Sequence, residues 1–160
     1  MIFNIIEDLE YKELITTQIY ETIEFLLNKD QEFAITANIN GVSFQPKIPD
    51  SISKSFSHST LFTLANYTYS TIELTDTTIS FEAGFGAENF GSVVTIPLSA
   101  VFQIVIDESI LFLNPTATVE RYFKKEEQTQ SVEEVDKDQE QRSLNAFKMN
   151  SKNKNLFNKF

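Results

Sequence analysis

A succession of short strand-like segments between residues 32 and 113 limits the fold more than any other feature of the chain. The segments are rich in Ile, Val, Phe, Thr and Tyr, the residues that suit a pleated, half-buried surface. In chain order they are EFAITANI, VSFQPKI, TLFTL, YSTIEL, TISFEAGF, SVVTIPL, AVFQIVI and SILFL. Turn formers separate them, for example at Asn40-Gly41, Pro49-Asp50, Asp76 and Asn89. Connections this short leave no room for crossover helices, so we expect a strongly bent antiparallel sheet, as a small barrel or a sandwich.

One amphipathic helix is predicted ahead of the strands, over residues 8–27. Its apolar residues recur at spacings of three and four, namely Tyr11, Leu14, Ile15, Ile19, Ile23, Leu26 and Leu27. Acidic residues lie largely between them and gather toward the start, where they complement the helix dipole. Asn28 and Lys29 mark the expected end. The chain is therefore expected to be mainly β, with one N-terminal α-helix of about five turns.

Composition excludes several classes of protein. The 160 residues suffice for one domain with a hydrophobic core. Cysteine is absent, which removes disulfides, thiol nucleophiles and cysteine-ligated zinc. A formal net charge of −10 repels a phosphate backbone, so no nucleic-acid partner is expected. No apolar run reaches the roughly 20 residues of a membrane helix, and the acidic N-terminus is unlike a signal peptide. We expect a soluble cytoplasmic protein without a membrane partner.

The charge changes along the chain and divides it into three parts. Residues 1–123 carry a net charge of −11, residues 124–142 of −3 and residues 143–160 of +4. The middle part has two valines as its only apolar residues and no aromatic residue, so it is predicted to be a disordered acidic linker. A solvated helix is the alternative, because Glu, Lys and Gln form helices well. In the last part, apolar residues return beside lysine, which indicates either a fraying terminus or a short docking motif.

Candidate catalytic groups are few. His58, the only histidine, lies in the serine-rich stretch SKSFSHST, where exposure to solvent is expected; without a second histidine or a cysteine, no recognisable metal set remains. Gly84, Gly86 and Gly91 do not have the spacing of a phosphate loop and are better suited to a turn or to close backbone approach. The many carboxylates are predicted to be surface charges. We therefore predict a binding module with no cofactor, and not an enzyme.

The stretch ISFEAGFGAENFGSVVTIPLSAVFQIVIDESILFLNP, from residue 79, resembles the signature region of the SspB family, the stringent starvation protein B adaptors of the ClpXP protease. The positions that follow the family pattern are Ile79, Phe81, Phe85, Gly86, Val94, Ile96, Pro97, Leu98, Ala100 and Val101. The resemblance extends back through LFTLANYTYSTIELTD to IEDLEYKEL, which is similar to the opening of the alphaproteobacterial members. It also reaches SLNAFK in the tail. The pattern departs from the family at Ala87, which replaces a second glycine, and at Asn145, which replaces an aspartate.

Membership of this family would imply an SspB/Sm-like small antiparallel barrel over residues 1–123. It would also imply a homodimer that involves the N-terminal helix, for which the candidate residues are Leu14, Ile15, Ile19 and Ile23. The alternative is that this apolar stripe belongs to the core, because one stripe cannot be divided between core and interface from the sequence. The barrel would bind ssrA-type degradation tags, and the tail would dock on the ClpX N-terminal domain. The family function is delivery of tagged proteins to ClpXP for proteolysis.

The tag-binding groove is predicted from two stretches, LFTLANY and FEAGF. Side chains of a strand alternate between its faces, so one set of residues should fill the core and the other should line the groove, and either set suits either role. The candidate groove residues are Phe62, Leu64, Ala65, Asn66, Tyr67, Phe81, Glu82, Ala83, Gly84 and Phe85. The small residues would let an extended peptide lie close, and Asn66 and Tyr67 would supply hydrogen bonds. The alternative is that these are ordinary strand positions.

The docking motif has two candidates within residues 143–160. The first is SLNAFK, formed by Ser143, Leu144, Asn145, Ala146, Phe147 and Lys148, which is closer to the family pattern. The second consists of Leu156, Phe157, Lys159 and Phe160. Three functions compete: the proteolytic adaptor, a module of Sm-like fold that binds RNA or other peptides without delivery, and a small enzyme that uses buried carboxylates. The negative charge of residues 1–123 argues against RNA, and no substrate suggests itself for an enzyme.

Overall fold

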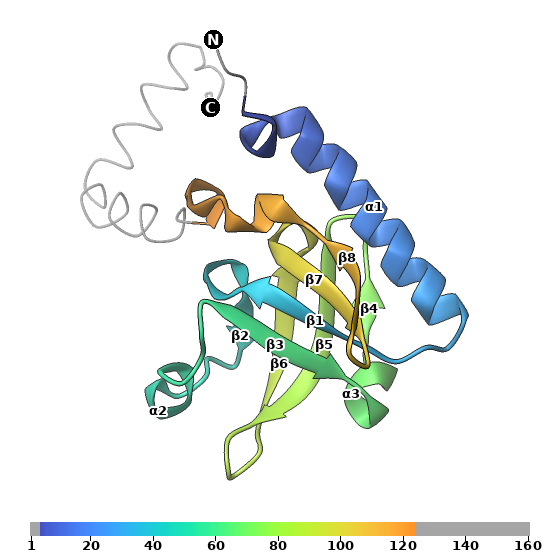
Figure 1. The fold of residues 1–160 in the computed structure, drawn as a ribbon. Coiled ribbons are helices and arrows are strands. Elements are labelled where there is room, and N and C mark those ends of the chain that lie inside the picture. The colour runs from blue at the N-terminus through green and yellow to red at the C-terminus, as the bar shows by residue number, and fades with distance from the viewer. Residues whose placement is uncertain (1–3, 124–160) are drawn as a thin grey trace, which may run out of the picture. The chain divides into compact units, whose positions relative to one another are not determined.

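A computed structural model describes residues 4–123 of the chain (Figure 1). One long helix, α1 (Leu9–Asn28), precedes eight strands and two short helices. The strands are β1 (Phe33–Asn38), β2 (Ser43–Gln45), β3 (Ser59–Leu64), β4 (Glu73–Leu74), β5 (Thr78–Phe85), β6 (Phe90–Pro97), β7 (Val101–Ile106) and β8 (Ser109–Leu113). The short helices are α2 (Asp50–Ser53) and α3 (Asn66–Ser70). The predicted linker, residues 124–142, and both docking candidates within residues 143–160 lie outside the described residues.

Helix α1 begins and ends close to where the sequence predicts. Asp8 is the N-cap, and its carboxylate accepts hydrogen bonds from the N–H groups of Glu10 and Tyr11, at 2.7 and 3.1 Å. The helix ends at Asn28, and Lys29 is the C-cap. The predicted apolar stripe divides, however, because only part of it faces the core. The buried residues of the helix are Ile15, Ile19, Ile23 and Leu26.

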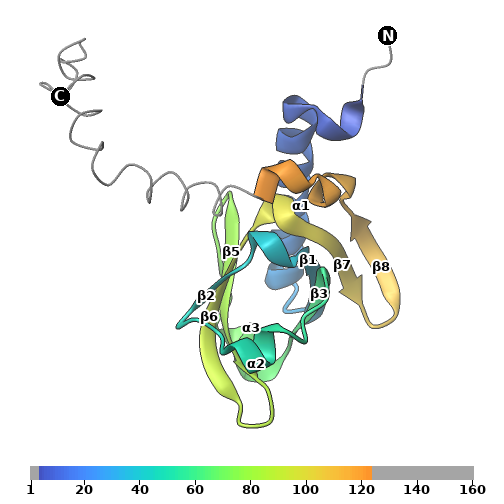
Figure 2. The same cartoon turned by 90° about the vertical axis from the view of Figure 1, so that its left-hand side faces the viewer.

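The strands form two antiparallel sheets of four, ordered β3-β1-β7-β8 and β2-β6-β5-β4 (Figures 1 and 2). Antiparallel pairing confirms the prediction. Of the two expected forms, a barrel or a sandwich, the barrel that the family resemblance implies is not closed, because no pairing joins the outer strands of one sheet to those of the other within residues 4–123. The stretch YSTIEL is also only partly a strand: Tyr69 and Ser70 belong to α3, and β4 is two residues long.

Two sharp bends connect the sheets. The turn Ile39–Gly41 joins β1 to β2, and the turn Leu98–Ala100 joins β6 to β7, so that β1 pairs with β7 in one sheet and β2 with β6 in the other. The bends pack closely: a Cβ on Gly41 would lie 2.9 Å from the Ala100 Cβ and 3.0 Å from the ring of Phe123. Only glycine leaves room for this contact. The tight bends turn one continuous ladder into two sheets that face each other.

The hydrophobic core lies between the two sheets and the buried stripe of α1. Alternation along β3 points Phe62 and Leu64 inward, and Phe81 does the same on β5. The rings of Phe62 and Phe81 meet edge to face with 5.8 Å between their centroids, which joins one sheet to the other. The fully buried aliphatic residues around them are Ile19, Ile23, Ile35, Leu64, Ile79, Val94, Ile96, Leu98, Val101 and Ile104.

A buried asparagine secures the bend between β6 and β7. The Asn114 side chain is completely buried, and its Nδ2 donates to the carbonyls of Ser99 and Val101 at 3.1 and 2.8 Å. Its Oδ1 accepts from the N–H and the hydroxyl of Thr116 at 2.9 and 2.6 Å. All the polar atoms of this side chain are therefore used, which offsets the cost of burying it.

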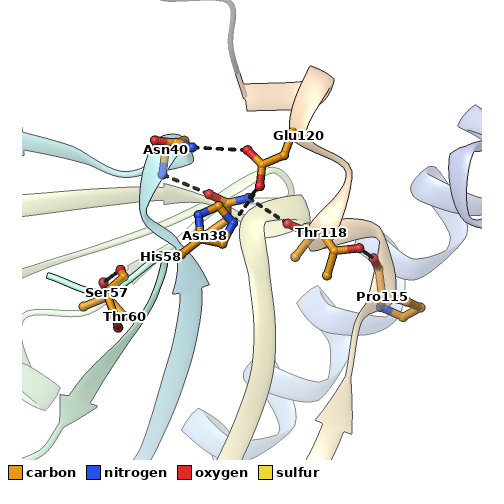
Figure 3. Close-up of polar contacts among 9 residues, drawn as sticks. Asn38, Asn40, Ser57, His58, Thr60, Pro115, Thr118 and Glu120 are labelled. Atoms are coloured by element: carbon orange, nitrogen blue, oxygen red, sulfur yellow. Dashed lines mark hydrogen bonds and ion pairs between the residues drawn. The ribbon is translucent and has the colours of Figure 1, made fainter.

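A second polar cluster holds the last described segment, Glu120–Phe123, against the end of β1 (Figure 3). The Glu120 carboxylate lies 2.6 Å from His58 Nε2 and accepts from the side chains of Asn38 and Asn40, at 3.3 and 3.2 Å. The Asn38 amide also donates to the Ala117 carbonyl at 2.9 Å. The His58 side chain is 59% exposed, in line with the expectation of a solvent-facing residue.

Candidate functional site

A hollow of about 430 Å³ lies where the β5–β6 hairpin meets α3 and the end of β2. The hairpin turn extends beyond the sheets between α2 and α3 (Figure 1). The residues around the hollow are Gln45, Pro46, Tyr67, Thr68, Glu82, Ala83, Gly84, Asn89, Gly91, Ser92 and Val93. The strand register explains this set: Gln45 pairs with Val93, and Val93 pairs with Glu82, so three strands contribute one row of side chains.

The floor of the hollow has few side chains because two glycines are cross-strand partners. Gly84 of β5 pairs with Gly91 of β6. A Cβ built on Gly91 has no atom within 4 Å, so open space lies above that residue. The Asn89 side chain covers Gly84, since its Oδ1 would lie 1.7 Å from a Cβ there. The open space of the hollow is therefore over Gly91, whereas Asn89 occupies the equivalent space over Gly84.

Tyr67 and Glu82 form one rim of the hollow. The Tyr67 hydroxyl donates to Glu82 Oε1 at 2.6 Å, although Tyr67 is 66% exposed. This hydrogen bond, together with the negative charge of Glu82, raises the pKa of the Tyr67 phenol above its ordinary value of 10.0. The phenol is protonated at neutral pH, as it is at its ordinary pKa, and its hydrogen bond orients the carboxylate.

The β5 backbone beside this rim has a free edge. Strand β4 pairs only with Ile79 and Ser80, and the Glu82 N–H, which points away from β6, donates to the Thr71 hydroxyl at 2.9 Å. Backbone directions alternate along an antiparallel pair, so the N–H and C=O of Gly84 point the same way as those of Glu82. In the part of the chain that the structure describes, no hydrogen bond satisfies these two Gly84 groups. Such an edge can pair with an added strand.

Four of the ten predicted groove residues lie around the hollow: Tyr67, Glu82, Ala83 and Gly84. Ala65, Asn66 and Phe85 are near it without lining it. Ala65 precedes α3, the Asn66 N–H donates to Glu32 at 2.9 Å, and the Phe85 ring packs against Phe44 and Phe56.

The prediction is wrong for Phe62, Leu64 and Phe81, which are 4%, 0% and 2% exposed. They belong to the core because the inward face of β3 and β5 carries the aromatic and aliphatic residues. The outward face therefore contributes to the hollow, with Glu82 and Gly84 exposed.

Seven lining residues were missed by the sequence prediction, and they come mainly from β2 and β6. They are Gln45, Pro46, Thr68, Asn89, Gly91, Ser92 and Val93. Ser92 donates to the Pro46 carbonyl at 2.9 Å and thereby holds β2 beside the hairpin. The glycine pair Gly84/Gly91 was the available signal, because a hairpin that turns at residues 86–89 places these two residues opposite each other.

The predicted dimer residues of α1 require a correction. Ile15, Ile19 and Ile23 are 5%, 0% and 0% exposed within a single chain, so they are core residues. They cannot also be covered by a second copy. Leu14 is 53% exposed and remains available.

Residues 4–123 contain no group of three or more His, Asp and Glu side chains that could hold a metal ion. None of the helices in the same range is long and apolar enough to cross a membrane. No family model matches the sequence, and no curated protein matches it.

Proposed function

We propose that the chain is a cytoplasmic proteolytic adaptor that binds ssrA-type degradation tags in the hollow and delivers the tagged proteins to ClpXP. The observation that supports this most is the position of the hollow. It lies at LANY and FEAGF, the two stretches that the resemblance to the SspB family points to. The proposed fold class is an SspB/Sm-like fold in an open form. It is supported by the sharp bends through which β1 continues into β2, and β6 into β7, because a small barrel needs strands bent in this way.

The hollow suits an extended peptide. The free β5 edge at Gly84 offers one N–H and one C=O for main-chain pairing, and the open space over Gly91 leaves room for a peptide side chain. Main-chain hydrogen bonds would provide affinity, and side-chain contacts with the rim would provide specificity. In this proposal, Tyr67 and Glu82 contact peptide side chains, and Gly91 leaves open space over the exposed face of the sheet into which a peptide side chain extends.

Residues 124–142 are proposed as the tether, and residues 143–160 as the segment that docks on the ClpX N-terminal domain. SLNAFK is the preferred docking motif, because it is closer to the family pattern than the second candidate near the C-terminus. A tethered cargo would reach an effective concentration near the enzyme of the order of millimolar, with no new contact to the cargo.

A homodimer is proposed through the outer face of α1, opposite the core stripe. This face carries Leu14 and Phe25, which are 53% and 57% exposed. Phe25 lies beside a second hollow that includes Leu111 of β8, and Leu111 is 50% exposed. Exposed apolar residues that lie together on one face are typical of an interaction surface.

A glycine substitution tests the proposed site with little risk to folding. Gly91→Gln places a side chain into open space above the floor of the hollow, and replacing glycine inside a strand is expected to keep or slightly increase stability. We expect fluorescence-anisotropy titration to give saturable, sequence-dependent binding of a labelled ssrA-type peptide to the full chain. Gly91→Gln should weaken this binding at least tenfold, and Gly91→Ala should weaken it less.

Three controls complete the experiment. A scrambled peptide should not bind, and circular dichroism should show that both variants are folded. A chain that ends at Lys124 should bind the peptide normally but fail to accelerate ClpXP degradation of a tagged substrate. Unchanged peptide affinity in folded Gly91→Gln would place the binding site elsewhere.

A further inference from the structure

The charge of the hollow indicates which tags it accepts. We infer that the site selects peptides with a lysine or arginine side chain that reaches Glu82. This inference rests on the proposed function, since it specifies the chemistry of the cargo at the same site. Among residues 4–123, Glu82 is the only ionisable side chain around the hollow besides the Tyr67 phenol, and no Lys, Arg or His of this range lines it.

The Glu82 carboxylate is oriented but not saturated. Its Oε1 accepts from the Tyr67 hydroxyl at 2.6 Å, and within residues 4–123 no hydrogen bond or ion pair reaches Oε2. A carboxylate has about four lone-pair sites, so Glu82 retains the capacity to bind a cationic group. Because Tyr67 already holds it in place, little conformational entropy remains to be lost when a ligand binds.

Three of the five Lys and Arg residues within residues 4–123 contact other groups away from the hollow, and the remaining two, Lys47 and Lys54, do not line it. The Lys12 ammonium lies 4.3 Å from the centroid of the Tyr122 ring, and the Lys29 ammonium lies 5.6 Å from that of Phe25. Arg121 pairs with Glu7 at 2.7 Å. Residues 1–123 carry a net charge of −11, so the long-range field also favours cationic ligands.

The main-chain contacts explain why a peptide, and not a free cation, is the expected ligand. A peptide strand paired with β5 at Gly84 would have alternate side chains on the exposed face that carries Glu82. A basic side chain at one of these positions would reach the carboxylate, and an acidic one would be repelled. The pair is partly exposed, so each effect should be about threefold to fivefold in affinity.

Three pools of labelled short peptides would test the inference. Each pool contains randomised uncharged residues around one central residue, which is Lys in the first pool, Gln in the second and Glu in the third. Anisotropy titrations of the full chain at low salt should rank the affinities Lys over Gln over Glu, with about tenfold between the extremes. Glu82→Gln should abolish the ranking without loss of folding.

Glu88→Gln is the matched control, because Glu88 is an exposed acid in the hairpin turn that does not line the hollow. It should preserve the ranking. An equal loss of ranking in both variants, or equal affinity of the three pools for the wild type, would overturn the inference and leave the proposed function standing. Failure of every pool and of the ssrA-type peptide to bind a folded chain would overturn both.

Discussion

Replacing Asn114 by alanine should destabilise the domain severely, although the residue lies outside the hollow. The substitution removes the four hydrogen bonds that this side chain makes with Ser99, Val101 and Thr116, and all but the one to Ser99 are fully buried. At about 1 kcal/mol for each lost bond, the total cost is about 4 kcal/mol. Domains have a free energy of unfolding of only about 5–15 kcal/mol, so this is a large fraction.

Urea unfolding followed by circular dichroism measures this loss, and the chain has no tryptophan to offer as a fluorescence probe. With a slope of about 2 kcal/mol per molar urea, the midpoint should fall by about 2 M. Thr116→Val is the matched control, since it keeps the volume, removes only the hydroxyl and should cost about 1 kcal/mol. A loss below about 1 kcal/mol for Asn114→Ala would refute the assignment of Asn114 as the polar group that secures the β6–β7 bend.

Two further predictions concern α1 and the rim of the hollow. Ile19→Asp should abolish the circular dichroism signal of the folded chain, because it buries an unpaired carboxylate in the core. A folded Ile19→Asp chain would contradict the core assignment. Leu14→Asp, in contrast, should stay folded and shift a dimer to monomer in analytical ultracentrifugation. Tyr67 should ionise above pH 10.0, because the neighbouring Glu82 carboxylate disfavours the phenolate. The hydrogen bond from Tyr67 to Glu82 is complete below that pH and is lost as the pH rises through the raised pKa of the phenol. The difference in tyrosinate absorbance between wild type and Tyr67→Phe measures this titration. Glu82→Gln should move its midpoint to lower pH. An unmoved midpoint would mean that the hydrogen bond between Tyr67 and Glu82 is absent in solution.

Local patterns in the sequence predicted the type of most elements. The three- and four-residue spacing identified α1, and the Asp8 cap, which the prediction took as the start, binds the first N–H groups of the helix. Short β-rich segments with brief connections allowed only antiparallel pairing. Both features depend on residues a few positions apart, which is why sequence alone reveals them.

The stretches that form the hollow were predicted, but only some of their residues were. FEAGF and LANY were identified through the family resemblance, and Glu82, Ala83, Gly84 and Tyr67 line the hollow. Alternation shows that two sets of side chains point to opposite faces, but it does not show which face is covered. The set of β5 side chains that includes Phe81 lies in the core, because the other sheet covers that face of β5.

Only the tertiary structure decided the rest. Gln45 joins the hollow because β2 pairs with β6, and these two strands lie far apart in the sequence. The bends at Ile39–Gly41 and Leu98–Ala100, which pack against each other, place the strands on either side of each bend in different sheets. The apolar stripe of α1 that includes Ile19 packs into the core of its own chain, because the two sheets leave an apolar surface that the helix covers. Local spacing sets the periodicity of an element, whereas its partners depend on which surfaces remain unpaired when the whole chain has packed.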